Sequence, residues 1–349
     1  MLKQIIINEI KNKKNYINLE KFIDICLFNQ EGYYYKNLPI GKSGDFITSP
    51  EISQLFGEIL GLYILENWKK KYSCNINLIE LGPGNGTLMD DILRITKNKS
   101  NFHDLINIDL IEINKKLLSL QKKRLLKKQY NNIRFNWHND FSQIQSVPSI
   151  IIANEFFDCF PVRHFINENE VWYEKMIKYN LNKIKFYYEN LLVKNNELLF
   201  KIKNYNNSKI LELSEKRDDY FNRICKFISH SQGTIIVIDY GYYNHPSTFT
   251  LQAMYNHHYS NLLDNIGKQD ITSLVDFKSL ISIAKKNNLK IDIFCNQRDF
   301  LINNGIIHLK NKIFENCNEK QKDNLENGYK RLVDEKGMGE NFKFLIVSK

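Results

Sequence analysis

The sequence has no run of apolar residues near the roughly 20 that a membrane-spanning helix needs. Its first residues lack the apolar core and cleavage site of a secretory signal, and they include acidic residues, which are rare in mitochondrial presequences. With 349 residues, 43% of them apolar, the chain can bury one large core or two modest ones and is neither disordered nor fibrous. We therefore expect a soluble protein of the bacterial cytosol, with the mitochondrial matrix as the alternative.

Cysteine pairs of the C-x-x-C type are also missing. The six cysteines lie far apart in the sequence, which suggests neither a zinc site nor a disulfide framework, and we expect no metal. The formal charge of +10 could indicate a nucleic-acid surface, but 41 of the 49 basic residues are lysines scattered among 39 acidic residues. We interpret the charge as the compositional bias of a solvated surface, so nucleic-acid binding is not favoured.

Two phosphate-binding patterns are absent as well: G-x-G-x-x-G of dinucleotide sites and G-x-x-x-x-G-K-[ST] of phosphate loops. The chain instead has an apolar segment followed by Gly82, Gly84 and Gly86, with Glu80 just upstream. These glycines allow positive φ and leave no Cβ in the way of a ligand. A tight turn in any α/β protein could show this spacing, but strand, glycine turn and helix in this order favour a nucleotide-type cofactor. The motif resembles the first motif of class I S-adenosylmethionine-dependent methyltransferases.

Strand-length apolar segments alternate with helical segments along most of the chain. The expected strands are residues 78–81, 108–113, 133–137, 149–153, 234–239, 291–294 and 342–347. Such alternation predicts an α/β fold with a doubly wound, Rossmann-like sheet of seven strands. The first five segments are almost continuously apolar, as expected of central parallel strands that are covered on both faces. The order, with a strand at the very C-terminus, resembles the class I methyltransferase sheet, whose final strand is antiparallel.

Two regions fall outside this alternation. Residues 1–72 are expected to form an N-terminal helical region, with a helix start at residues 48–51 and an apolar stripe after it. Residues 165–210 contain short strand-like segments, at 171–176, 185–188 and 198–201, and would form a β-rich insertion in a cofactor-binding domain of residues 73–349. Ligands bind at the carboxyl ends of the strands in open α/β sheets, so the insertion would cover the site. We assign it to substrate recognition.

Acidic residues follow the second and third predicted strands. Glu112 stands at the tip of the second strand, where a carboxylate can accept hydrogen bonds from ribose hydroxyls. A helix-capping or surface role is the alternative for Glu112. After the third strand, Asn139 and Asp140 could contact an adenine amino group, although Asn-Asp pairs are also common in plain turns. Together with the glycine turn, Glu112 favours an adenosyl cofactor.

The fourth predicted strand runs directly into the acidic and aromatic loop Asn154–Pro161. A guanidinium is a poor nucleophile because its lone pair is delocalised and its positive charge does not titrate away. A carboxylate can grip the guanidinium fork, concentrate the charge on the far nitrogens and align the near nitrogen for attack. Glu155 is therefore the first catalytic candidate and Asp158 the second. Alternatively, the aromatic residues belong to the core and the acids cap a following helix.

Further motifs make the resemblance specific. The motifs are Gly44–Glu58, Glu80–Leu88, Asn154–Pro161, Asp239–Gly241, Thr250–Ala253 with His257, and Ile271–Thr272 with Val275–Phe277. In this order, over nearly the whole chain, they resemble the MidA-type family, whose human member is the mitochondrial complex I assembly methyltransferase. The resemblance implies a class I protein-arginine N-methyltransferase that uses S-adenosyl-L-methionine. In the family, the best described product is symmetric dimethylarginine on the 49 kDa-type subunit of respiratory complex I (NADH dehydrogenase), formed during assembly.

The resemblance also implies roles for single residues. It places the cofactor at Gly82, Gly84, Gly86 and Glu112, and the acidic loop at Glu155 and Asp158, the residues expected in catalysis. From their positions in the sequence, Glu80 and Asp140 are also expected at the cofactor. The residues expected in a segment that closes over the cofactor or the substrate are Asp45, Phe46, Pro50 and Glu51. His257 and Asp276 match family positions, but the sequence does not indicate what they do.

The chain departs from the family at Asn85, Cys159, Phe160 and Leu274. None of these departures removes a cofactor glycine or a loop acid, so they concern the substrate more than methyl transfer. Two other functions remain open from the sequence. One is S-adenosylmethionine-dependent methylation of a small molecule or a nucleic acid, and the other is a non-catalytic assembly chaperone that has retained the fold.

Overall fold

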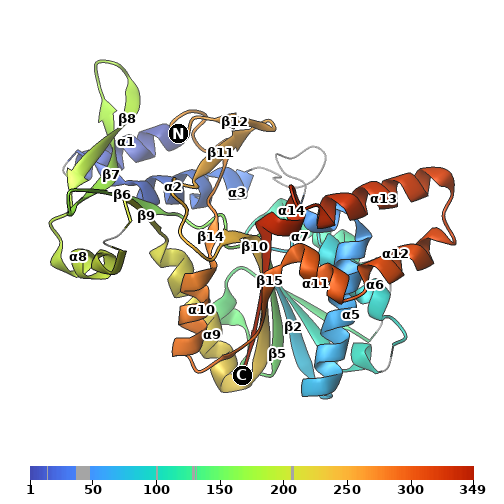
Figure 1. Cartoon of the computed structure of the whole chain (residues 1–349). Helices are drawn as coiled ribbons and strands as arrows, with labels where there is room; N and C mark the ends of the chain where they lie inside the picture. The colour runs from blue at the N-terminus through green and yellow to red at the C-terminus, as the bar shows by residue number, and fades with distance from the viewer. Residues whose placement is uncertain (14, 37–47, 100, 128–129, 131, 206–207) are drawn as a thin grey trace.

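The computed structural model describes the chain except residues 14, 37–47, 100, 128–129, 131 and 206–207. Its central element is an eight-stranded sheet with the order β15-β16-β10-β5-β2-β3-β4 and with β14 beside β10 (Figure 1). The strands are β2 (Ile76–Leu81), β3 (Ile106–Ile111), β4 (Arg134–His138), β5 (Ser149–Asn154), β10 (Gly233–Tyr242), β14 (Val275–Asp276), β15 (Lys290–Asn296) and β16 (Phe342–Ser348). The predicted doubly wound sheet is confirmed, and only the two-residue β14 goes beyond the seven expected strands.

Strand direction brings the glycine turn and the acidic loop together. β2 lies between β3 and β5 and runs parallel to both, and β10 runs parallel to β5. Leu81 of β2 lies opposite Ala153 of β5, so the residues that follow these two strands leave the sheet side by side. β16 lies between β10 and β15 and is antiparallel to each, as the resemblance implied for the last strand.

Helices cover both faces of the central sheet, each over its own apolar core. The helices on one face are α5 (Gln54–Lys71), α6 (Thr87–Thr96), α7 (Lys115–Leu126), α11 (Gln297–Asn303), α12 (Ile306–Phe314), α13 (Glu319–Val333) and α14 (Met338–Asn341). Those on the other face are α9 (Glu215–Ser231) and α10 (Phe277–Lys286). Side chains alternate along each strand, so Leu78 enters the first core and Ile79 the second. Burial on both faces explains the continuous apolar runs in the sequence.

A second sheet contains the predicted insertion, and the N-terminal helices pack on it. Its strands are β1 (Ile17–Asn18), β6 (Arg163–Glu168), β7 (Val171–Asn180), β8 (Lys185–Leu192) and β9 (Ile210–Leu213). The helices are α1 (Leu2–Asn12), α2 (Leu19–Phe28) and α3 (Tyr33–Lys36). The rings of Phe22 in α2 and Phe186 in β8 have centroids 5.9 Å apart. The first 36 residues therefore share a core with the insertion, whereas α4 (Ser49–Ile52) and α5 pack with the central sheet.

One predicted strand in the insertion is wrong. Residues 198–201 belong to the helix α8 (Asn196–Ile202). The Asn195 side chain accepts a hydrogen bond from the Leu198 N–H (3.0 Å) and so caps the helix, and Leu198 and Ile202 bury one face. In so short a segment, the apolar pattern does not separate a helix from a strand.

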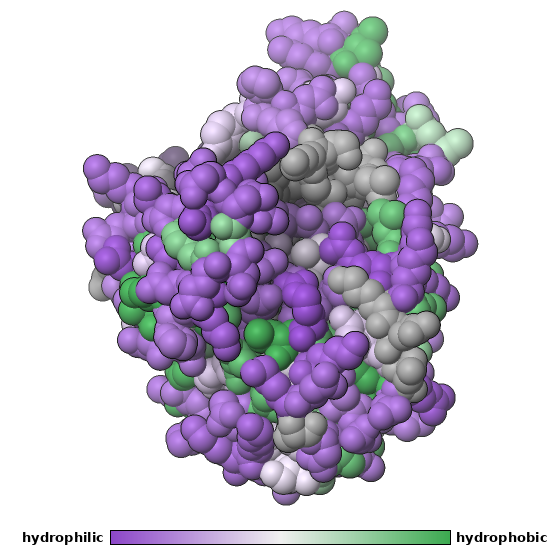
Figure 2. Space-filling view, turned by 90° about the vertical axis from the view of Figure 1, so that its right-hand side faces the viewer, coloured by the Kyte–Doolittle hydropathy of each residue, from purple (hydrophilic) through white to green (hydrophobic). Residues whose placement is uncertain are grey.

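Three short strands form a third sheet, namely β11 (Gln252–Tyr255), β12 (His258–Ser260) and β13 (Asp270–Thr272). The described residues also form three 3-10 turns, η1 (Phe102–Asp104), η2 (Phe141–Gln143) and η3 (Lys203–Tyr205). Figure 2 shows a face dominated by hydrophilic residues, with apolar residues in small separate areas. In the described part of the chain, no helix has the length and apolar character needed to cross a membrane.

Candidate active site

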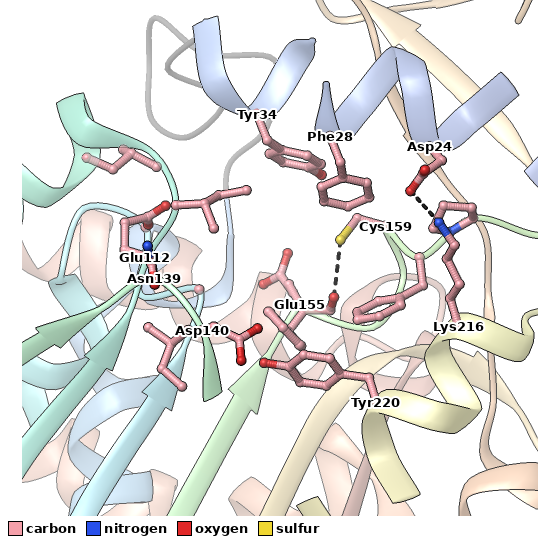
Figure 3. A pocket seen from close by; sticks show the side chains of 18 residues that line it. Asp24, Phe28, Tyr34, Glu112, Asn139, Asp140, Glu155, Cys159, Lys216 and Tyr220 are labelled. Carbon is pink, nitrogen blue, oxygen red and sulfur yellow. Dashed lines mark hydrogen bonds and ion pairs between the residues drawn. The ribbon is translucent and has the colours of Figure 1, made fainter. Parts of the chain in front are cut away.

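A cavity of about 310 Å³ lies at the carboxyl ends of the central parallel strands (Figure 3). Its strand side is formed by residues that follow β2, β3, β4 and β5, namely Gly82, Gly84, Glu112, Ile113, Asn139, Asp140, Glu155, Phe156, Cys159, Phe160 and Pro161. Its opposite side is formed by the N-terminal helices and the start of α9, with Asp24, Phe28, Tyr34 and Lys216. Tyr220 of α9 lines the cavity from the side of the acidic loop, where its ring packs on Phe156 and Phe160. The glycine turn and the acidic loop therefore meet in one cavity.

The glycine turn has a backbone conformation that residues other than glycine rarely adopt. The φ angles of Gly82, Gly84 and Gly86 are +62°, +53° and +75°, in the left-handed region. A Cβ on Gly82 would lie 3.1 Å from a ring carbon of Phe156. The turn therefore brings bare backbone to the cavity wall, which leaves room for a ligand.

Glu112 stands one residue beyond β3 and is fixed by two hydrogen bonds. One carboxylate oxygen accepts from the Asn114 N–H (2.7 Å) and the other from the Gln121 side-chain amide (3.0 Å). The buried Gln121 also donates to the Gly84 carbonyl oxygen (2.8 Å) and accepts from the Trp137 indole (3.1 Å). Burial raises the pKa of Glu112 to about 7, although these hydrogen bonds oppose the shift. Gln121 thus ties the glycine turn to the predicted ribose acid.

Glu155 faces the cavity from a strained backbone position. Its φ is +49°, and its N–H donates to the Ile238 carbonyl oxygen on β10 (2.8 Å). A carboxylate oxygen accepts a hydrogen bond from the Ser49 N–H at the start of α4 (2.8 Å). Burial raises the pKa of Glu155 to about 8; the Ser49 bond opposes this shift and the charge of Asp158 adds to it. The carboxylate therefore lies where a cation would favour its ionised form.

Three further carboxyl groups, those of Asp158, Asp239 and Asp270, lie near Glu155. Burial raises the pKa of Asp158 well above its usual range, and the negative charges of Asp239 and Asp270 add to this shift. Asp158 does not line the cavity, and its carbonyl oxygen accepts a hydrogen bond from the Ser273 N–H (2.9 Å). The structure thus brings the two predicted catalytic acids into one loop but places only Glu155 on the cavity wall.

A smaller hollow of about 40 Å³ shares Gly82, Gly84 and Glu155 with the main cavity. It is also lined by Glu80, Asn154, Pro50 and Glu51. Glu80 is buried within β2, and burial together with the charge of Glu112 raises its pKa to about 8. Among the described residues, one carboxylate oxygen of Glu80 and the amide oxygen of Asn154 have no hydrogen-bond partner. Glu51 accepts a hydrogen bond from the Thr87 hydroxyl (2.5 Å). The hollow therefore offers acceptors for a cationic donor.

The remaining predicted residues lie in different places. Asp140 caps η2 and also lines the main cavity. His257 is exposed in the turn between β11 and β12, and Asp276 caps α10; neither lines the cavity. Asp45 and Phe46 lie outside the described residues.

Two further residues of the site, Gln121 and Tyr34, were not predicted from the sequence. Gln121 occurs midway between Leu117 and Leu125 at helical spacing, and a polar residue in an apolar stripe is the signal that could have found it. The Tyr34 hydroxyl donates to the Asp270 carboxylate (2.9 Å), a residue 236 positions away. No sequence pattern indicates a contact at that separation.

The sequence is similar to known methyltransferases. Residues 59–295 match the sequence model of a family of S-adenosyl-L-methionine-dependent methyltransferases. Two relatives are named mitochondrial protein arginine methyltransferase NDUFAF7. The Xenopus laevis protein is 30% identical over 91% of this chain and 77% of its own length, and the human protein is 29% identical over 91% and 76%.

Solved structures with the same fold come from Burkholderia thailandensis. One is a COG1565 superfamily member bound to S-adenosyl-homocysteine, with a TM-score of 0.85, 19% identity and coverage of 100% of this chain and 92% of the other. The native structure of a protein of the same superfamily has a TM-score of 0.85 at 21% identity and covers 100% and 91%. At this identity the likeness shows the fold, which supports the predicted class I architecture.

Proposed function

Because the chain belongs to this family of S-adenosyl-L-methionine-dependent methyltransferases, we propose that it methylates an arginine nitrogen of a protein substrate. The names of the relatives favour arginine as the acceptor. The observation that carries the proposal within this chain is the ionisable carboxyl of Glu155 on the wall of the cavity, with further buried carboxyls behind it.

The residues of the cavity fit the cofactor. Gly82 and Gly84 leave room beside the backbone, and Glu112 retains acceptor capacity for hydroxyl groups because each carboxylate oxygen can accept more than one hydrogen bond. We assign the partnerless oxygens of Glu80 and Asn154 to the ammonium group of the cofactor. Bound S-adenosyl-L-methionine supplies an electrophilic methyl group.

The charge around Glu155 favours a cationic acceptor. Burial raises the pKa values of Glu155, Asp158 and Asp239, and the negative charges of neighbouring carboxylates, Asp270 among them, add to these shifts. The buried Arg217 is a cation that opposes the shifts of Asp158 and Asp239. Ionised carboxylates that are buried in a low-dielectric environment without a positive partner raise the free energy of the protein. A guanidinium that enters the cavity would therefore be stabilised there. Glu155 would hold the fork of that guanidinium and direct one nitrogen toward the methyl donor.

The opposite wall suits a planar cation. Phe28 and Tyr34 from the N-terminal helices present aromatic groups to the cavity from this wall, and Tyr220 of α9 presents its ring from the side of the acidic loop (Figure 3). A guanidinium stacks on such rings. Asp24 of α2 forms an ion pair with Lys216 of α9 (2.6 Å) at the same wall. Because α2 packs on the second sheet, we propose that residues 165–210 recognise the substrate by placing this wall.

We test the proposal with the purified protein, tritiated S-adenosyl-L-methionine and a set of peptides. We expect label to enter arginine-containing peptides, and acid hydrolysis to recover it as methylarginine. The same peptides with lysine in place of arginine are the control and should remain unlabelled. Equal labelling of the lysine peptides, or label in nucleic acid and none in arginine peptides, would overturn arginine specificity.

We further propose, on the resemblance of the sequence, that the protein substrate is the 49 kDa-type subunit of respiratory complex I. Incubation of that subunit with the enzyme and labelled cofactor, followed by mass spectrometry, identifies the methylated arginine. The same subunit with this arginine replaced by lysine is the control. The two relatives are named mitochondrial, whereas the bacterial cytosolic location of this chain stays a prediction.

The pH profile should report the ionisation of Glu155. Its pKa is raised to about 8 by burial, and only the ionised carboxylate attracts a guanidinium. We therefore expect kcat/KM for the acceptor, measured at saturating cofactor, to rise with pH through about 8 and then level off. Arginine stays protonated over this range. In Glu155→Gln this rise should be absent, and an unchanged profile in that variant would assign the pKa to another group.

Gln121→Leu should weaken cofactor binding. The substitution keeps the approximate size of the side chain but removes the hydrogen bonds of Gln121 to the Gly84 carbonyl oxygen, to one carboxylate oxygen of Glu112 and from the Trp137 indole, while the other Glu112 oxygen keeps the Asn114 N–H. Each lost partner costs about 1 to 3 kcal/mol, part of which affects folding and part binding. We expect the Kd of S-adenosylhomocysteine, measured by calorimetry, to rise about tenfold or more. Ser119→Ala, on the exposed face of the same helix, should bind as the wild type does.

A further inference from the structure

Asp239 makes an unusual set of hydrogen bonds to the acidic loop. One of its carboxylate oxygens accepts from the backbone N–H groups of Phe156 (3.2 Å), Phe157 (2.8 Å) and Asp158 (3.3 Å). The other accepts from the Tyr240 N–H (2.9 Å). The side chain of Asp239 is fully buried and does not line the cavity. Both oxygens are thus used within the protein, and none of these contacts requires a substrate.

The backbone of the loop explains why the three N–H groups converge. Glu155 has a left-handed φ of +49°, which turns the chain immediately after β5. Successive N–H groups in such a turn point into one concave site that attracts an anion. Without an acceptor these buried donors would lack partners, which strongly disfavours a folded loop. The Asp239 carboxylate supplies that acceptor from β10.

β10 also fixes the backbone of Glu155, the residue with the candidate catalytic carboxylate. The Glu155 N–H donates to the Ile238 carbonyl oxygen (2.8 Å), the residue just before Asp239. On the far side of the turn, the Asp158 carbonyl oxygen accepts from the Ser273 N–H (2.9 Å). The loop is therefore clamped on both sides of Glu155, and the Asp239 carboxylate binds the three N–H groups between these clamps.

We propose that Asp239 is a positioning residue that fixes the backbone of residues 155–158 and thereby directs the Glu155 carboxylate into the cavity. The inference rests on the proposed role of Glu155 in holding the acceptor. It gives a physical role to the first residue of the Asp239–Gly241 motif. Asp239 itself touches neither cofactor nor substrate, so its effect on the reaction passes through Glu155.

Asp239→Asn tests this role. An amide has one acceptor oxygen and one donor nitrogen, so its NH2 group must face at least one of the N–H groups that the carboxylate accepts from. We expect kcat for an arginine peptide to fall about 100-fold, an effect typical of a misplaced catalytic group. The Kd of S-adenosylhomocysteine should change less than threefold. Asp109→Asn, which also neutralises a buried carboxyl on a central strand, is the matched control and should keep kcat within threefold.

A double-mutant cycle separates positioning from general loss of structure. If Asp239 acts through Glu155, Asp239→Asn should slow the reaction little further in a Glu155→Gln background. Multiplicative losses in the double variant would overturn the inference. A full rate in Glu155→Gln alone would instead reject the proposed role of Glu155, so the two failures are distinguishable.

Hydrogen exchange on the wild-type protein gives a test that does not depend on how the variant folds. The amides of Phe156, Phe157 and Asp158 share one buried acceptor, so we expect all three to be protected and to exchange together. Exchange of these amides at the rate of an unfolded chain, while the amides of β5 remain protected, would show that the clamp does not exist.

Discussion

Glu155→Gln is expected to lower kcat by about 10² to 10³-fold, as removal of one preorganised electrostatic group does in other enzymes. Glutamine has almost the same shape as glutamate, and its amide oxygen can still accept the Ser49 N–H. It carries no negative charge, however, and its NH2 group would meet the donor nitrogens of a guanidinium. The loss should therefore appear in the transfer step, which single-turnover kinetics with labelled cofactor measures.

Cofactor binding provides the check on this first result. The Kd of S-adenosylhomocysteine and the melting temperature of Glu155→Gln should stay close to those of the wild type. Glu168→Gln, at the end of β6 and outside the cavity, is the matched control and should keep its full rate. A Glu155→Gln enzyme that retains its rate would remove the carboxylate from the mechanism. If that variant lost all transfer yet still supported complex I assembly in cells, the chaperone hypothesis would gain support.

Gly84→Val should raise the Kd of S-adenosylhomocysteine at least about 100-fold, because two effects act together. The φ of Gly84 is +53°, a conformation that costs a side-chain-bearing residue about 1 to 2 kcal/mol and costs β-branched residues more. The valine methyl groups would also occupy the cavity wall, where the turn leaves room for a ligand. Isothermal calorimetry measures the binding, and thermal unfolding measures the strain.

Gly305→Val separates these two effects. Gly305 has a φ of +88° at the start of α12, and a Cβ there would meet no atom within 4 Å. The substitution should therefore impose comparable strain and lower the melting temperature, but leave cofactor affinity unchanged. If Gly305→Val weakened binding as much as Gly84→Val does, the loss would come from general destabilisation. Normal binding by Gly84→Val would exclude the glycine turn as the cofactor site.

The central sheet could be predicted because each of its long strands leaves a local signal. Strands such as β2 and β5 are buried on both faces, so their residues form continuous apolar runs. The glycine turn follows β2 directly and needs left-handed backbone, which glycine adopts without a steric cost. Features of this kind are local, so adjacent residues are enough to indicate them.

Other parts of the site depend on contacts between distant residues. Tyr34 contacts Asp270, and Ser49 contacts Glu155, which is 106 positions away in the sequence. These two hydrogen bonds join residues that lie far apart in the sequence, so no spacing pattern indicates them. The helix α8 was missed for a different reason, because its short apolar pattern does not distinguish a helix from a strand and its cap at Asn195 also fits a turn.

The two sides of the cavity differ in how far apart their residues lie in the sequence. The side that we propose for the cofactor comes from one stretch, from Gly82 to Asp140, in which each strand is followed by its own turn. The opposite wall joins residues 24–34 to α9 and depends on packing between α2 and β8. Contacts of long sequence separation form late in folding, and such regions can open while the rest of a domain stays folded. Mild destabilisation should therefore disrupt this opposite wall first. The enzyme would then still bind its cofactor but could no longer enclose its substrate.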